Sequence, residues 1–106
     1  MTRVRLCAAT DLKPGEVRRF EPDGSSFAVA LVRCDDAWRA AVDNCSHEDY
    51  PLSEGEVVPD VCEIECVKHG STFSLIDGAP QSFPATRPIT ILDVEEEGGD
   101  VYVVLP

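Results

Sequence analysis

The stretch that decides the fold is NCSHEDY, residues 44–50, together with its echo CVKHG at residues 66–70. The chain has only two histidines, and each stands shortly after a cysteine. A thiolate and an imidazole this close together can bind a metal from one tight loop, and two such loops brought together make a four-ligand site. The expected ligands of a metal centre are therefore Cys45, His47, Cys66 and His69.

The order of these ligands separates two kinds of metal centre. Zinc fingers usually take both cysteines from one pair and both histidines from the other. Here each pair is mixed, which suits a [2Fe–2S] cluster in which two cysteines hold one iron and two histidines hold the other. A zinc-stabilised interaction module that uses the same four residues is the alternative from another functional class.

The sequence resembles the Rieske family. CSH at residues 45–47 and CVKHGSTFSL at residues 66–75 look like its C-x-H and C-x-x-H-G boxes, and the resemblance runs from about Ala40 to the C-terminus. It implies one Rieske-type [2Fe–2S] cluster, with two thiolates on the inner iron and two imidazoles on the outer iron. The cofactor-binding and metal-binding residues that it implies are Cys45, His47, Cys66 and His69.

The resemblance also implies residues around the cluster. Gly70, Ser71 and the backbone of both boxes would donate hydrogen bonds to the cluster sulfurs. The segment SFPAT, residues 82–86, would be the loop that covers the cluster, with Pro84 packed nearby. An ordinary turn proline is the alternative for Pro84.

Outside the boxes the chain predicts an all-β domain. Short β-type runs are separated by Pro, Gly and Asp turns, and the run 26–34 is apolar on both faces, as in a central strand. Hairpins are expected around Asp35–Asp36 and around Gly98–Gly99. The family resemblance makes this a Rieske fold: an antiparallel β-sandwich or small barrel base with an inserted two-loop cluster-binding subdomain.

Length and composition favour a single domain. With 106 residues, of which 43% are hydrophobic, the chain has room for one modest core. We expect one Rieske [2Fe–2S] domain over residues 1–106, with the cluster-binding subdomain at about residues 43–84. Between Asp43 and Phe83 only CEIEC and TFSLI look like strands, and the remainder is expected to be irregular.

The charge and the apolar runs bear on partners and location. The net charge is -11, with nine basic residues against 20 acidic ones, so nucleic acid is a poor partner and a protein partner is expected. The apolar runs are too short to cross a bilayer, and the N-terminus lacks the apolar region of a signal peptide. We therefore expect no membrane association, a cytoplasmic location and a monomer.

The five cysteines are expected to remain reduced, because their number is odd and no export signal is visible. Cys7 and Cys34 stand in apolar strand contexts and are expected to fill the core. For Cys62 the alternatives are a spare ligand, a redox-sensitive thiol or a small, partly buried residue, and the last is favoured.

Two features indicate a low reduction potential. Respiratory and photosynthetic Rieske proteins carry an extra cysteine in each box, and these form a disulfide, whereas the boxes here have none. Acidic residues close to the boxes also stabilise the oxidised, less negative cluster. These residues are Glu48, Asp49, Glu54, Glu56, Asp60, Glu63 and Glu65.

The sequence predicts an electron carrier and no enzyme. The chain is too short for an oxygenase active site, both histidines are used by the cluster, and no Gly-rich dinucleotide motif is present. It is similar to the small Rieske ferredoxins of bacterial multicomponent dioxygenases, which pass electrons from a flavin-containing reductase to a terminal non-haem iron oxygenase.

Two alternatives within this fold remain open at this point. The gap between the boxes is slightly longer than in typical dioxygenase ferredoxins, and its segment VVPDVCE, residues 57–63, resembles Rieske ferredoxins associated with iron–sulfur cluster assembly. The small subunit of assimilatory nitrite reductase also resembles this fold but often lacks the ligands, so the complete ligand set disfavours it.

Overall fold

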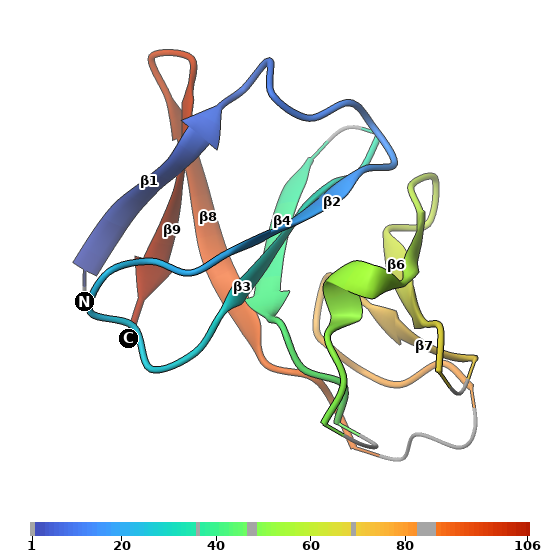
Figure 1. The fold of residues 1–106 in the computed structure, drawn as a ribbon. Coiled ribbons are helices and arrows are strands. Elements are labelled where there is room, and N and C mark those ends of the chain that lie inside the picture. Colours follow the sequence, from blue (N-terminus) through green and yellow to red (C-terminus); the bar gives the residue numbers. More distant parts are fainter. Residues whose placement is uncertain (1, 36, 47–48, 69, 83–86) are drawn as a thin grey trace.

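The computed structural model in Figure 1 describes residues 2–35, 37–46, 49–68, 70–82 and 87–106. In these residues the chain forms two antiparallel sheets and one short 3-10 helix, which confirms the predicted all-β class. The elements are β1 (Thr2–Ala8), β2 (Val17–Phe20), β3 (Val29–Arg33), β4 (Trp38–Val42), η1 (Leu52–Glu54), β5 (Glu56–Val58), β6 (Glu63–Cys66), β7 (Ser71–Ser74), β8 (Ile91–Glu97) and β9 (Asp100–Leu105).

The larger sheet has the strand order β1-β9-β8-β4-β3-β2. Both predicted hairpins are present: β3 pairs with β4 up to Arg33 opposite Trp38, and β8 pairs with β9 up to Glu97 opposite Asp100. β1 and β2, which flank the turn LKPGE, lie at opposite edges of this sheet, since β1 pairs with β9 and β2 with β3. We call this larger sheet the base sheet.

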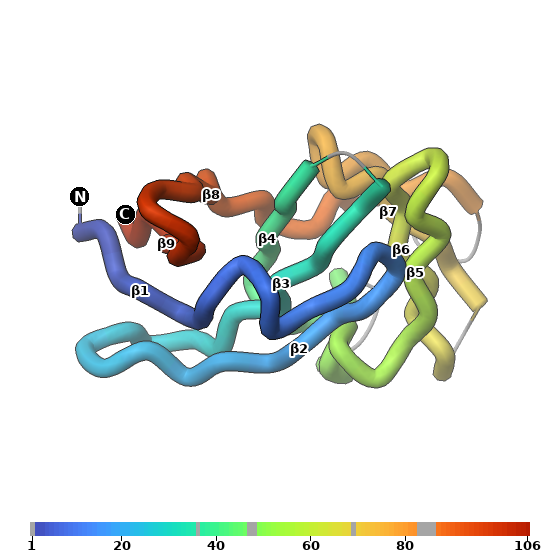
Figure 2. The backbone as a smooth tube through the Cα atoms, turned by 90° about the horizontal axis from the view of Figure 1, so that it is seen from above, coloured from blue at the N-terminus to red at the C-terminus, as the bar shows by residue number. Residues whose placement is uncertain are grey.

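This base sheet curls around the first of two cores, as Figure 2 shows from above. Leu31 of β3 and Ala40 of β4 point into this core, whereas Val32 and Ala41, the next residue on each strand, belong to the second core. Successive side chains of a strand point to opposite faces, so β3 and β4 are buried on both sides. The strand predicted within the apolar run 26–34 is present and covers Val29–Arg33.

The smaller sheet has the order β5-β6-β7 and lies beside the base sheet (Figure 1). β6 and β7 were expected, but β5 was not, because its short run alternates exposed and half-buried residues and offers no strong apolar pattern. β5 comes alongside β6 only because residue 55 is glycine: a Cβ there would lie 1.7 Å from the carbonyl oxygen of Glu65. The region between the boxes is therefore more regular than expected.

The second core lies between the two sheets. Its buried side chains come from β3 and β4 of the base sheet, from the two boxes, and from the segments next to them in the chain. Its buried members are Val32, Cys34, Ala41, Cys45, Leu52, Cys62, Ile64, Cys66, Phe73, Leu75 and Ile89. Four of these eleven are cysteines, and two of the four are predicted ligands.

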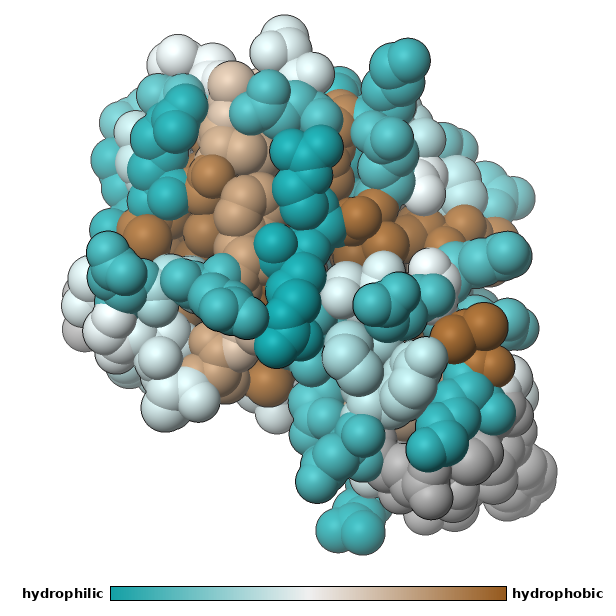
Figure 3. All heavy atoms as spheres, in the orientation of Figure 1, coloured by the Kyte–Doolittle hydropathy of each residue, from teal (hydrophilic) through white to brown (hydrophobic). Residues whose placement is uncertain are grey.

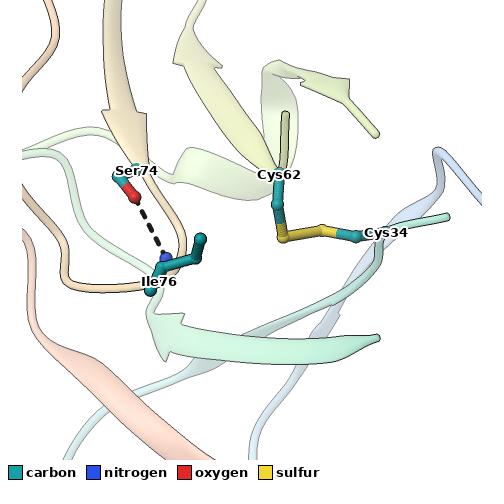
Figure 4. The surroundings of a disulfide bond; sticks show 4 residues. All are labelled: Cys34, Cys62, Ser74 and Ile76. Carbon is teal, nitrogen blue, oxygen red and sulfur yellow. Dashed lines mark hydrogen bonds between the residues drawn. A yellow bond between two sulfur atoms is a disulfide. The ribbon is translucent and has the colours of Figure 1, made fainter. Parts of the chain in front are cut away.

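The expectation that all five cysteines stay reduced is wrong for two of them. Cys34 and Cys62 form a disulfide, with their Cα atoms 5.4 Å apart (Figure 4). Both are buried in the second core, so the predicted burial is correct for each. The pairing escaped the sequence because the two cysteines are 28 residues apart and meet only through the tertiary fold.

The acidic hairpin tip at Glu95–Glu97 is partly neutralised within the chain. The guanidinium of Arg3 lies 3.2 Å from Glu95 and 3.3 Å from Glu97, and it stacks on the ring of Tyr102. Such exposed pairs contribute little to stability. These contacts are those of a solvated hairpin tip.

The surface in the view of Figure 3 is largely polar, with apolar residues showing between the charged ones. The exposed large hydrophobic residues of the described chain all lie in or beside the smaller sheet: Val58, Val61, Val67 and Ile76. Within the described ranges, no helix is long and apolar enough to cross a bilayer.

Candidate metal centre

The first box begins directly after β4, where the chain leaves the base sheet. The Cys45 side chain is buried, with only 1% of the residue exposed, and its backbone N–H donates a hydrogen bond of 2.8 Å to the carbonyl of Tyr50. This bond closes residues 45–50 into a loop. His47 lies inside that loop but outside the described residues.

The second box begins at the last residue of β6. Cys66 is fully buried, and its carbonyl accepts a 2.8 Å hydrogen bond from the N–H of Gly70, which closes the turn between β6 and β7. Gly70 has φ +72°, a left-handed conformation that glycine adopts without steric cost. His69 lies in this turn but likewise outside the described residues.

The two closed loops bring their cysteines into one core. Cys45 and Cys66 both belong to the second core, and neither takes part in the disulfide. Buried thiols that can ionise on metal binding are the soft ligands that an iron–sulfur cluster requires. The residues present therefore fit the predicted cofactor on its sulfur side.

The two predicted histidine ligands, His47 and His69, lie outside the described residues. Among the side chains that the structure does describe, no group of three or more His, Cys, Asp or Glu residues lies close enough to hold a metal ion. The predicted ligand set of Cys45, His47, Cys66 and His69 therefore stays a prediction.

The segment predicted to cover the cluster is tied down at its two ends. On one side, the Thr72 N–H donates to Ser82 Oγ at 3.0 Å, and Gln81 N–H donates to the Thr72 carbonyl at 2.7 Å. On the other side, the Ser46 hydroxyl donates to the carbonyl of Arg87. The flanks of this segment are thus bound to β7 and to the first ligand loop, although Pro84 itself lies outside the described residues.

The two predicted neighbours of the cluster stand where the second loop enters β7. Gly70 ends the turn, and Ser71 is the first residue of the strand and is fully buried. Ser71 thus lies next to the loop that begins at Cys66. The hydrogen bonds of Gly70 and Ser71 to cluster sulfurs remain predictions.

Asp43 is a supporting residue that the sequence did not reveal. Its side chain is buried, and its carboxylate accepts hydrogen bonds from Arg19 Nη1 at 2.9 Å, from the Ser53 N–H at 2.7 Å and from Ser53 Oγ at 2.6 Å. The hydrogen bond with Asp43 raises the pKa of the Arg19 guanidinium. An aspartate after a strand has no distinguishing pattern, so only the fold shows that it fastens η1 and β2 beside the first loop.

Tyr50 and Lys68 connect the two loops to each other. The Lys68 ammonium lies 5.6 Å from the centroid of the Tyr50 ring, and Tyr50 packs against the second core. A cation over an aromatic face is attracted to the ring quadrupole. These contacts make Tyr50 an anchor of the first ligand loop.

Comparison with known proteins agrees with this geometry. Residues 2–95 match the Rieske [2Fe-2S] domain family. Ferredoxin CarAc of Metapseudomonas resinovorans is 40% identical over 100 residues, covering 94% of this chain and 91% of the relative. The 3-phenylpropionate/cinnamic acid dioxygenase ferredoxin subunit of Escherichia coli K12 is 35% identical over 106 residues, covering 100% of this chain and 96% of the relative.

Solved structures give the same result. The ferredoxin of carbazole 1,9a-dioxygenase from Nocardioides aromaticivorans IC177 superposes with a TM-score of 0.89 at 34% identity, covering 97% of each chain. A chain from a complex of reduced oxygenase and oxidized ferredoxin in carbazole 1,9a-dioxygenase gives a TM-score of 0.87 at 39% identity, with 95% of this chain and 100% of that chain covered.

These similarities confirm the predicted Rieske fold and [2Fe–2S] cofactor class, and they confirm an electron carrier of the ferredoxin type. Several curated relatives are ferredoxin components of dioxygenases, and they match this chain over nearly its whole length. The chain belongs to the Rieske [2Fe–2S] domain family, and within it to the ferredoxins.

Proposed function

We propose that this protein is the ferredoxin of a multicomponent dioxygenase, passing single electrons from a flavin-containing reductase to a terminal non-haem iron oxygenase. The observation that carries the proposal is the burial of Cys45 and Cys66 in one core, each at the start of a loop closed by a backbone hydrogen bond. When bound, a Rieske [2Fe–2S] cluster supplies reversible one-electron oxidation and reduction.

The proposed ligand set is Cys45, His47, Cys66 and His69. Cys45 and Cys66 would hold the cluster from the core side through their thiolates. Gly70 ends the second ligand loop and Ser71 begins β7. The segment around Pro84 would cover the cluster and exclude water from it. Residues 43–84 would form the cluster-binding subdomain on the base sheet.

The proposed acceptor follows from the relatives. A similar ferredoxin forms a complex with the oxygenase of carbazole 1,9a-dioxygenase. In this chain, Val67 of the second loop is 52% exposed, which places an apolar contact beside the proposed ligands. An apolar residue surrounded by charge is suited to a brief protein–protein contact of the kind that electron transfer requires. The reductase as donor and a monomeric state are part of the same proposal.

A cytoplasmic location is proposed with it, because three of the five cysteines lie outside the disulfide and the predicted ligands must remain reduced until the metal binds. Association with iron–sulfur cluster assembly is the less favoured alternative, since the curated relatives named above are dioxygenase ferredoxins. Electron transfer to a dioxygenase is therefore the function proposed.

A spectrum and a metal analysis test the cluster. The purified protein should be coloured, with close to two irons and two labile sulfides per chain for a [2Fe–2S] cluster. Cys45→Ser and Cys66→Ser should abolish the cluster, while His47→Ala and His69→Ala should lose it or bind it poorly. Cys7→Ser is the matched control, because Cys7 is a buried cysteine of the other core and should leave the iron content unchanged.

A colourless protein that contains zinc would overturn the proposal in favour of an interaction module. Full iron content in either ligand-cysteine variant would refute the ligand assignment. Electron delivery is tested separately, by reducing the protein with a flavin-containing ferredoxin reductase and measuring single-turnover oxidation by a Rieske dioxygenase. A loaded, reduced protein that no such oxygenase oxidises would overturn the proposed acceptor.

A further inference from the structure

The Cys34–Cys62 disulfide joins the two sheets of the molecule covalently. Cys34 follows the last residue of β3 in the base sheet, and Cys62 immediately precedes β6 of the smaller sheet. Figure 4 shows the bond spanning the space between these two segments. β6 ends at Cys66, so the bridge lies at the start of the strand whose end carries a proposed ligand.

Besides the pairing of Glu63 with Val58 and Ser74, two backbone hydrogen bonds of the described residues lie at this end of the smaller sheet. The Asp35 N–H donates to the Pro59 carbonyl at 3.3 Å, and the Leu75 N–H donates to the Cys62 carbonyl at 2.9 Å. Cys62 has φ +55°, in the left-handed region that non-glycine residues rarely occupy. A residue stays in such a conformation only where its surroundings hold it there, and the disulfide is the strongest of these restraints.

The two residues joined by the bond differ slightly in exposure. Cys34 is 1% exposed and Cys62 is 9% exposed, while the neighbouring Val61 is 52% exposed. A small opening of the turn between β5 and β6 would bring Cys62 Sγ to solvent without disturbing β3. Attack by an external thiolate is therefore expected at Cys62.

Disulfides that occur in reducing compartments are usually transient or redox-sensing. We propose that Cys34–Cys62 is a redox-responsive tether, which fixes the cluster-binding subdomain to the base sheet when oxidised and releases the turn before β6 when reduced by a dithiol carrier. The effect on cluster retention rests on the proposed ligand set, whereas the tether itself does not.

The exchange follows ordinary thiol–disulfide chemistry. A thiolate of the dithiol reductant attacks Cys62 Sγ, the S–S bond breaks, and Cys34 leaves as a thiolate that takes up a proton. The second thiol of the reductant then attacks the mixed disulfide, which releases Cys62 as a thiol and leaves the reductant as a disulfide. The protein gains two electrons and two protons, and oxidised glutathione can reverse the reaction by taking them back.

The bond itself is tested by mapping it in the folded holoprotein. The protein is treated with oxidised glutathione or with dithiothreitol, then denatured in excess iodoacetamide and digested. After oxidation, Cys34 and Cys62 should appear in one linked peptide while Cys7 carries the label; after reduction, both should be labelled. Label on both cysteines after oxidation, or a bond that dithiothreitol cannot open in the folded protein, would overturn the proposal.

The release of the turn is tested by hydrogen exchange at the Leu75 amide, which bonds to the Cys62 carbonyl. Removing the cross-link should speed exchange at least about tenfold in the wild type, because a closed loop restrains the opened state. Cys34→Ala/Cys62→Ala should exchange fast with or without dithiothreitol, and Cys7→Ala should behave as the wild type. Equal exchange rates in the two wild-type redox forms would contradict the tether.

Cluster retention gives the third measurement. Visible absorbance should decay faster in reduced than in oxidised wild type, while dithiothreitol should not change the decay in Cys34→Ala/Cys62→Ala. A decay that dithiothreitol accelerates equally in both proteins would mean that the reagent attacks the cluster directly, and would refute the effect on retention. A protein that holds no cluster would refute the proposed function. The disulfide mapping and the hydrogen exchange at the Leu75 amide would still test the tether.

Discussion

Arg19 Nη1 lies 2.9 Å from Asp43 Oδ2, and this ion pair joins β2 at the edge of the base sheet to the residue that follows β4. The Asp43 side chain is fully shielded from solvent, whereas that of Arg19 is 42% exposed. The same carboxylate accepts hydrogen bonds from the backbone N–H and the hydroxyl of Ser53 in η1. One buried carboxylate thus positions the segments on either side of the first ligand loop.

Asp43→Ala should lower the free energy of unfolding by about 1–3 kcal/mol, because the Ser53 amide loses its acceptor in a partly buried position. Urea unfolding of the holoprotein measures this loss. Glu21→Ala is the matched control, since Glu21 also contacts Arg19 but is 75% exposed, and its removal should change stability little. Equal effects of the two substitutions would contradict the role assigned to Asp43.

Gly55→Ala should destabilise the smaller sheet by more than about 1–3 kcal/mol, the usual cost of overpacking. The added Cβ would lie 1.7 Å from the Glu65 carbonyl oxygen, and backbone cannot move aside as a flexible side chain can. Thermal unfolding and iron content are the measurements. Gly24→Ala is the comparison: a Cβ there meets no atom within 4 Å, so its only cost is the strain of an alanine at φ +80°, about 1–2 kcal/mol. A larger loss at Gly24 than at Gly55 would refute the close approach.

Ser46→Ala should shorten the lifetime of the cluster. The Ser46 hydroxyl fastens the first ligand loop to the Arg87 carbonyl, and a lost hydrogen bond of this kind costs about 1 kcal/mol. The rate at which visible absorbance bleaches in the presence of an iron chelator measures the change. Ser74→Ala, which removes the hydroxyl that accepts from the Ile76 N–H at the end of β7, should bleach at the wild-type rate.

The reduction potential should lie in the lower part of the Rieske range of roughly -150 to +300 mV. Negative charge near the cluster stabilises the oxidised state, so Glu65→Gln beside Cys66 should raise the potential by on the order of 10–30 mV. Glu96→Gln, in the distant hairpin of β8 and β9, is the control and should not shift it. A redox titration that gives a wild-type value well above zero would contradict the prediction.

Stability should fall as the pH rises above the ordinary range of a thiol, about 8.5, in part because of Cys7. Burial raises the pKa of the Cys7 thiol, so above that range the unfolded chain loses this proton before the folded chain does. The contribution is present at lower pH and is lost as the pH rises through the folded-state pKa. Urea unfolding should show that the free energy of unfolding declines less between pH 7 and 10 in Cys7→Ala than in the wild type. An equal decline in the two proteins would exclude Cys7 as a cause.

The sequence predicted the hairpins and the central strand because their patterns are local. The turn residues at positions 98 and 99 and the apolar run at positions 26–34 carry the necessary information within a few residues. β5 escaped prediction because its pairing depends on a close approach between Gly55 and Glu65, which are distant in sequence. Asp43 escaped for the same reason, since its partners Arg19 and Ser53 come from other elements.

The sequence by itself determined which class of chemistry to expect: two mixed pairs of cysteine and histidine at short spacing predict cluster ligands without any tertiary contact. Only the tertiary structure showed which cysteines are joined in a disulfide. Cys34 and Cys62 bond to each other, while Cys45 and Cys66 meet in the same core outside that bond. The physical reason is that ligand spacing is a local property of the chain, whereas a disulfide depends on two sheets packing together.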